Sequence, residues 1–123
     1  MNQIKRFLEK SSLTYTDLAK LIYSLNEHEY VFSGPISNNW YKYDGTTWHR
    51  VNNDFMKKEI KDIISKIFSG MQSILEKEPI KQNDSLINQL ENKKDNISFI
   101  VKVLEECQGY FFDSSYSRMP SRL

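Results

Sequence analysis

Aromatic and basic side chains occur together in one short stretch of this chain, WYKYDGTTWHRV at residues 40–51, and three more lysines follow soon after it. Aromatic rings stack on nucleobases and basic side chains contact phosphates, so this combination suits single-stranded nucleic acid. The candidate nucleic-acid-binding residues are Lys42, Trp48, Arg50, Lys57, Lys58 and Lys61. Three acidic residues dilute their positive charge: Asp44, Asp54 and Glu59. A charged run on a helix is also a common feature of an ordinary solvated face.

The same stretch fits the aromatic half of a small core. Asp44-Gly45 is a strong signal for a tight turn, because both residues tolerate a positive φ angle. It predicts strands at about residues 40–43 and 46–51, and the β-branched and aromatic residues from Tyr30 predict a further strand. Such a small antiparallel sheet is stable only when helices pack on it.

The alternation of side chains along these strands leaves two interpretations open. If Asp44-Gly45 forms the turn, Tyr41 lies opposite Trp48 on one face of the sheet. Trp40 then lies opposite His49 on the other face. In one interpretation a long helix buries one tryptophan-bearing face, and the other face is an ordinary rim. In the other, an exposed tryptophan belongs to a surface that binds phosphates and stacks on bases.

Residue types that carry out catalysis or hold metal ions are sparse. The four glycines cannot compose a phosphate-binding GxxxxGK[ST] loop or a dinucleotide-binding GxGxxG turn. His28 and His49 lack the neighbours of an activated nucleophile. Cys107, the one cysteine, lies on the apolar side of a helical pattern and is expected to be buried. We therefore expect no catalytic residue, no metal site and no cofactor.

Apolar residues recur with helical spacing in five segments, at about residues 4–10, 14–26, 56–75, 86–92 and 97–107. Thr14, Thr16 and Asp17 supply start signals for the second segment, and Asn53 or Asp54 a cap for the third. Pro79 is expected to end the third helix and Gly109 the last. The predicted fold is α+β and mainly α, with amphipathic helices packed on a small antiparallel aromatic hairpin.

The length of 123 residues fits one domain, which we expect to span residues 1–112, with a flexible polar tail at 113–123. Seventeen basic and sixteen acidic residues give a net charge of +1, so nucleic-acid binding would depend on a local patch. No apolar run approaches the roughly 18 residues of a membrane span, and the charged N-terminus does not resemble a signal peptide. A cytoplasmic location without membrane contact is expected, in the host cell if the chain is viral.

The order DLAKLIYSLNEHEYVFSG, then NNWYKYDGTTWHRVNNDFMKKEIKDII, resembles the helical domain that precedes the superfamily 3 helicase core in poxvirus-type primase-helicases of large DNA viruses, phages and plasmids. The shared pattern is a helix, a short YVF-like stretch, an aromatic hairpin and a long amphipathic helix. Trp40-Tyr41, Asp44-Gly45 and Trp48 fit the hairpin positions. The resemblance covers about residues 16–75 and is weaker toward Cys107.

This resemblance implies a non-catalytic collar or linker that supports helicase assembly and DNA handling, with ATPase motifs further along a longer chain. The expected partners are helicase and primase domains, weakly bound single-stranded or duplex DNA, and further copies in a helicase ring. The chain is then either an excised module or a stand-alone relative. The alternative is a protein-interaction module whose hairpin never contacts nucleic acid. An uncharacterised enzyme is a third class, which the missing catalytic patterns disfavour.

Overall fold

The computed structural model describes residues 2–10, 12–34, 36–77 and 84–113. This part of the chain contains two helices, then three strands, then three more helices. They are α1 (Asn2–Leu8), α2 (Tyr15–Asn26), β1 (Tyr30–Phe32), β2 (Trp40–Tyr43), β3 (Trp48–Val51), α3 (Asn53–Lys77), α4 (Asp84–Lys93) and α5 (Ile97–Phe111). The predicted class is confirmed: the fold is mainly helical with one small antiparallel sheet.

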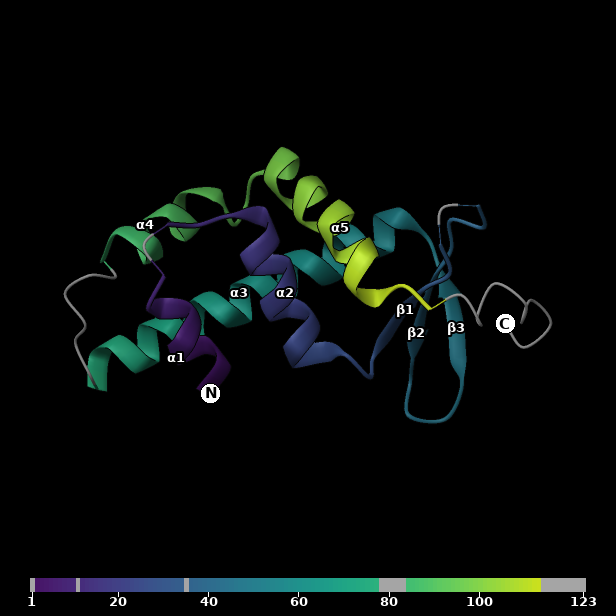
Figure 1. The fold of residues 1–123 in the computed structure, drawn as a ribbon, viewed down its shortest axis with the longest axis horizontal. Helices are drawn as coiled ribbons and strands as arrows, with labels where there is room; N and C mark the ends of the chain where they lie inside the picture. Colours follow the sequence, from purple (N-terminus) through teal and green to yellow (C-terminus); the bar gives the residue numbers. More distant parts are fainter. Residues whose placement is uncertain (1, 11, 35, 78–83, 114–123) are drawn as a thin grey trace.

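Helix α3 runs along the long axis of the molecule and connects its two ends (Figure 1). The sheet lies at the end where α3 begins, and α1 and α4 lie toward the end where it finishes. Between them, α2 and α5 pack against each other over much of their length, and α5 also contacts α3. The helices share one core with the inner face of the sheet.

Helices α2 and α5 begin at conventional polar caps. The Thr14 side chain accepts a hydrogen bond from the backbone N–H of Asp17, as the start signals predicted. Asn96 does the same for Phe99, at the predicted break between α4 and α5. Apolar residues at helical spacing then supply one buried stripe on each helix. These are Leu18, Ala19, Leu21 and Ile22 on α2, and Phe99, Ile100, Val103, Leu104, Cys107 and Phe111 on α5.

Helix α3 buries the predicted stripe, but its cap differs from the prediction. The side chain of Asn52, rather than that of Asn53 or Asp54, accepts the hydrogen bond from the backbone N–H of Phe55. Sequence reasoning missed this because three neighbouring residues all have side chains that can cap a helix. Further along, Gly70 leaves room for α1, since an added Cβ there would lie 3.0 Å from Cδ1 of Ile4.

The strands pair in the order β1-β2-β3, and both pairs are antiparallel. Our expected register is wrong by two residues, because Trp48 pairs with Tyr43 and not with Tyr41. The loop residues are Gly45 and Thr46, and the backbone N–H of Asp44 donates to the carbonyl of Thr47 across the loop. Gly45 has a φ angle of 99°, which suits glycine at the first position of a two-residue loop.

The inner face of the sheet packs mainly on the end of α5, not on the long helix alone as expected. Phe111 makes edge contacts with Trp40 and Tyr30, with ring centroids 5.8 and 6.0 Å apart. Trp40 also packs on Phe32 at 5.1 Å and is only 1% exposed. Helix α3 adds a polar contact through Glu59, whose carboxylate accepts hydrogen bonds from strand side chains.

Helix α5 continues through Gly109 to Phe111, so the predicted stop at that glycine is wrong. Burial of Phe111 in the core outweighs the propensity cost of one glycine, about 1 kcal/mol. The chain then follows β1, where Phe112 forms a parallel bridge with Phe32. Gly34, at a φ angle of 107°, accommodates the ring of Phe112. The predicted stop at Pro79 and the predicted flexible tail beyond Asp113 lie outside the described residues.

Replacing Ile63 or Ile67 by aspartate tests this architecture. Both side chains are buried in the stripe of α3, so an unpaired carboxylate there should cost several kcal/mol of the roughly 5 to 15 kcal/mol typical of a domain. Thermal melting followed by circular dichroism should show loss of the folded state. Ile97→Asp is the matched control, because Ile97 is 67% exposed in the first turn of α5. A wild-type melting temperature in both buried variants would contradict the fold.

Candidate nucleic-acid interface

The outer face of the hairpin, turned away from the core, carries two of the six predicted binding residues. Trp48 and Arg50 are two positions apart on β3, so their side chains leave the strand on the same side. Their partners across the pair are Tyr43 and Tyr41. Trp40 lies on the opposite, inner face, as the alternation predicted. Tyr41 is buried, whereas Trp48 is partly exposed and Arg50 is exposed.

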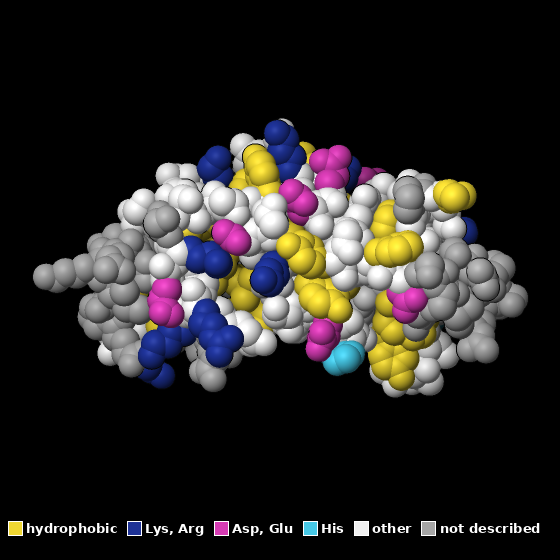
Figure 2. Space-filling model, viewed as in Figure 1, with side chains coloured by type: hydrophobic (Ala, Val, Ile, Leu, Met, Phe, Trp, Pro, Cys, Tyr) yellow, Lys and Arg dark blue, Asp and Glu magenta, His cyan; other side chains and the backbone are white. Residues whose placement is uncertain are grey.

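An aromatic pair marks the tip of this outer face. The rings of Tyr43 and Trp48 lie 5.1 Å apart with an interplanar angle of 38°. Tyr43 is 37% exposed, and its hydroxyl donates to the carbonyl of Gly45 in the loop. Side chains that are held by each other and by the loop keep their ring orientation without a ligand. Hydrophobic side chains are also visible over the sheet in Figure 2.

A polar hollow of about 470 Å³ adjoins the base of the hairpin. Its lining consists of Asn38, Asn39, Arg50, Val51, Asn52 and Asn53. Asparagine amides both donate and accept hydrogen bonds, so they can pair with polar base edges or sugar hydroxyls. The guanidinium of Arg50 makes no ion pair or hydrogen bond with any residue that the structure describes. It is therefore available to an anionic group at this hollow.

The loop of the hairpin is held by its own carboxylate. Asp44 Oδ1 accepts hydrogen bonds from the backbone N–H groups of Thr46 and Thr47, each 2.8 Å long, and Oδ2 lies 2.6 Å from Nε2 of His49. The hydrogen bond from Thr47, followed by those from His49 and Thr46, holds the pKa of Asp44 well below its usual range. The carboxylate is charged, and both of its oxygens accept hydrogen bonds within the hairpin, which holds the loop in one conformation.

Lys42 lies on the inner face and is used by the fold. Its ammonium group pairs with Glu59 of α3, and the same carboxylate oxygen accepts a 2.6 Å hydrogen bond from the hydroxyl of Tyr30. Partial burial acts to raise the pKa of Glu59. The hydrogen bonds from Lys42 and Tyr30 outweigh it, so this pKa lies below its ordinary value. Lys42 connects the sheet to α3 and does not belong to the outer face.

The three predicted binding lysines on α3, Lys57, Lys58 and Lys61, form a separate group. Lys57 pairs with Asp54 at 3.6 Å, and Lys61 lies 3.9 Å from Asp95, which follows α4. Lys58 is exposed and makes no ion pair with a described residue. Glu59 lies about 200° around the helix axis from Lys57 and from Lys61, and about 100° from Lys58, so these lysines occupy a different flank of α3 from the one that holds Lys42.

The predicted set is therefore divided among three places, and Trp48 with Arg50 is the part that the structure brings together. Tyr43 and the asparagines of the hollow were missed as site residues. The alternation of the strand could have identified Tyr43, which lies opposite Trp48. The two Asn-Asn pairs are visible in the sequence, but only the folded hairpin brings them to one hollow.

Cys107 is buried as predicted, and this burial raises its pKa to about 12, which suppresses the reactive thiolate. Within the described ranges, no three His, Cys, Asp or Glu side chains gather as they would around a metal ion. None of the described helices combines the length and the apolar character needed to cross a bilayer.

Neither protein-family models nor curated proteins gave a match to this chain. The geometry of the hairpin and the resemblance of its sequence pattern are therefore the basis for a functional proposal.

The Glu59 carboxylate should make stability depend on pH. A carboxylate whose pKa is lowered by folding stabilises the protein above its ordinary pKa of about 4.3, and this contribution is lost as pH falls through the lowered value. Glu59→Gln should lower the melting temperature at pH 7, and the difference from wild type should shrink toward pH 3. The exposed Glu91→Gln is the control. Parallel acid curves for wild type and Glu59→Gln would contradict the role of this carboxylate.

Proposed function

We propose that this domain is a non-catalytic module of a DNA replication primase-helicase that contacts single-stranded DNA through the outer face of its hairpin. The observation that carries the proposal is the position of Trp48 and Arg50 on one face, beside Tyr43 and the asparagine-lined hollow. Bases stack on aromatic rings regardless of their identity, and a cation alongside contacts the phosphate. This surface is suited to handling a strand without reading its sequence.

The expected affinity is low for the isolated domain. The outer face offers one free cation among the described residues, Arg50, and the net charge of +1 provides little long-range attraction. We expect a Kd no lower than the 10⁻⁴ to 10⁻⁶ M, roughly, that is usual for non-specific contacts. Several copies acting on one strand would raise the affinity through multivalency.

The replication context comes from the sequence resemblance. A collar or linker beside a superfamily 3 helicase core would hold the hairpin near the strand while the motor domain hydrolyses ATP. Primase and helicase domains, and further copies in a ring, are the partners that this proposal requires. A viral origin and a cytoplasmic location belong to the same proposal.

A protein-docking module is the second candidate. Ile36, between β1 and β2, is 99% exposed, and Phe112, which forms a bridge with Phe32 of β1, is half exposed. Exposed apolar side chains that gather in one region often mark a protein-binding surface. This alternative predicts binding that is insensitive to salt and independent of Arg50.

Titration of the protein with fluorescently labelled single-stranded DNA tests the proposal. Binding should weaken between about 50 and 200 mM salt, since released counterions give a negative salt slope. Trp48 should be quenched by base stacking, and Trp48→Phe should remove most of that quenching because Trp40 is buried. Arg50→Gln should weaken binding and reduce the salt slope by about 0.7, the value for one phosphate contact on a single strand.

Lys77→Gln is the matched control, because it removes one exposed charge from the end of α3 that lies away from the hairpin. The double variant Lys57→Glu/Lys58→Glu shows whether the α3 lysines belong to the same surface, and melting curves of every variant monitor folding. If the affinity for DNA is the same at both salt concentrations and in folded Arg50→Gln and Trp48→Phe variants, the DNA proposal is rejected and protein docking is favoured.

A further inference from the structure

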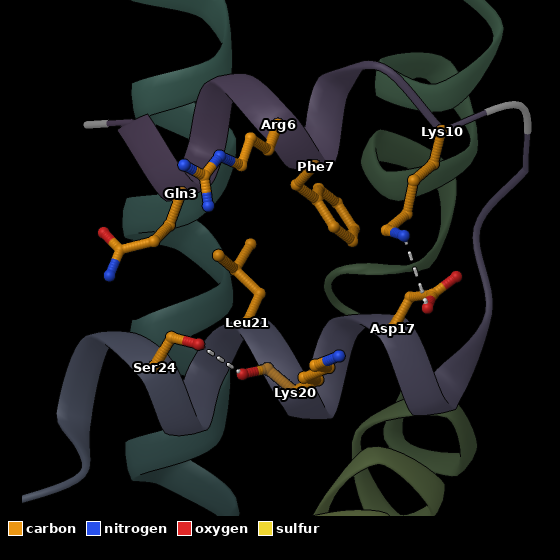
Figure 3. Close-up of a pocket in the computed structure, with 8 residues that line it drawn as sticks. All are labelled: Gln3, Arg6, Phe7, Lys10, Asp17, Lys20, Leu21 and Ser24. Atoms are coloured by element: carbon orange, nitrogen blue, oxygen red, sulfur yellow. Dashed lines mark hydrogen bonds and ion pairs between the residues drawn. The ribbon is translucent and has the colours of Figure 1, made fainter.

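A second groove, separate from the hairpin, lies between α1 and α2 (Figure 3). Its lining comes from α1 with the turn after it, and from one side of α2. The residues are Gln3, Arg6, Phe7 and Lys10 from the first, and Asp17, Lys20, Leu21 and Ser24 from the second. In the space-filling view, basic side chains gather on the part of the surface where α1 lies (Figure 2). The sequence pattern alone assigned none of these residues to a binding site.

The groove has more positive than negative charge. Lys10 lies 3.7 Å from Asp17, and this pair neutralises itself. The side chains of Arg6 and Lys20 form no ion pair with any described residue, although both are exposed at the groove. Two uncompensated cations therefore face one small space, in a protein whose overall charge is only +1. An anion placed between them would lower their mutual repulsion.

The floor of the groove is apolar. Phe7 and Leu21 lie between the polar groups, and both are buried apart from the small part that faces the groove. The volume of about 240 Å³ is below the range of roughly 300 to 1,000 Å³ typical of sites for drug-sized ligands. The groove can therefore enclose one compact anionic group and only the adjoining part of a larger ligand.

We propose that the α1–α2 groove binds a phosphate monoester, with the phosphoryl group between Arg6 and Lys20 and its organic part over Phe7 and Leu21. The planar guanidinium of Arg6 can donate two parallel hydrogen bonds to phosphate oxygens, and Lys20 adds a mobile point charge. Gln3 offers amide donors at the same opening. The hydroxyl of Ser24 already donates to the carbonyl of Lys20, so it can only accept.

The dianionic charge of the ligand distinguishes it from a carboxylate. A phosphate monoester carries about −1.5 to −2 charges at pH 7 and three acceptor oxygens, which matches two free cations and an amide. A single carboxylate carries one negative charge and would neutralise only one of the two positive charges. An extended acidic peptide is also a poor fit, because Asp17 lines the groove and would repel a second negative group.

Adenosine 5′-monophosphate is the first probe. Its binding is measured by the change in backbone amide chemical shifts. Its addition should perturb amides of α1 and α2, whereas adenosine without the phosphate should not. The double variant Arg6→Gln/Lys20→Gln should weaken the binding by about tenfold or more, because both charged donors are lost. Lys66→Gln/Lys77→Gln is the charge-matched control, since it removes two exposed lysines of α3 outside the groove and should leave the affinity unchanged.

Asp17→Asn supplies a test with the opposite sign. Removing this carboxylate frees Lys10 and eliminates repulsion at the groove, so the nucleotide should bind more tightly than to wild type. The cap of α2 is retained in this variant because it uses the backbone N–H of residue 17. A loss of affinity in a folded Asp17→Asn protein would overturn the proposed arrangement.

Two sources of the phosphate monoester are separated by comparing oligonucleotides with and without a 5′-terminal phosphate. If the phosphorylated strand binds more tightly, and this gain is lost in Arg6→Gln/Lys20→Gln, the ligand is a strand terminus. If the mononucleotide binds but the two oligonucleotides bind equally, the ligand is a free nucleotide. Unchanged affinity for both in the double variant would overturn the proposal. Arg50→Gln should leave the affinity for the mononucleotide unchanged, so the mononucleotide titration is independent of the hairpin experiment.

Discussion

The burial of Trp40 determines where the rest of the hairpin side chains lie. Successive residues of a strand leave it on opposite faces, so placing Trp40 inside places Trp48 and Arg50 outside. A tryptophan buries about 150 to 250 Å², which at about 25 cal/mol per Å² contributes roughly 4 to 6 kcal/mol. The indole Nε1 has no acceptor among the described residues, which costs about 1 to 3 kcal/mol. Apolar burial stabilises this arrangement by more than the missing hydrogen bond costs, and it therefore fixes the face.

A sheet of three short strands is not stable alone, so its attachment to the helices also orients the candidate interface. Phe111 of α5 supplies the apolar contact, and Glu59 of α3 supplies the polar one through Tyr30 and Lys42. The second contact removes Lys42 from the surface charge. Arg50 is left as the cation of the outer face, because it sits on the opposite side of the sheet from Glu59. Lys42 thus serves the stability of the hairpin, whereas Arg50 is the cation that the proposed DNA contact would use.

The sequence was sufficient for features that depend on local periodicity. Helical spacing identified the amphipathic helices, and strand alternation identified opposite faces for Trp40 and Trp48. Prediction from the sequence failed where alternative caps or turn positions have similar free energies. Asn52 and its two neighbours can each cap a helix, and a loop at Asp44-Gly45 or one residue later satisfies the same turn chemistry. The partner of Lys42 depended on how α3 lies against the sheet, which no local pattern encodes.

The two candidate surfaces are held apart by α3, and this separation limits what one ligand can do. The sheet meets α3 at Glu59, and α1 packs on it at Gly70, about eleven residues further on and therefore about 16 Å along the axis. A mononucleotide cannot contact the hairpin and the α1–α2 groove together. A longer strand that reached both would make its second contact within one complex, at a high effective concentration. The two proposed surfaces of this nearly neutral domain would then act as one stronger binding unit, although neither would contact more than a few phosphates.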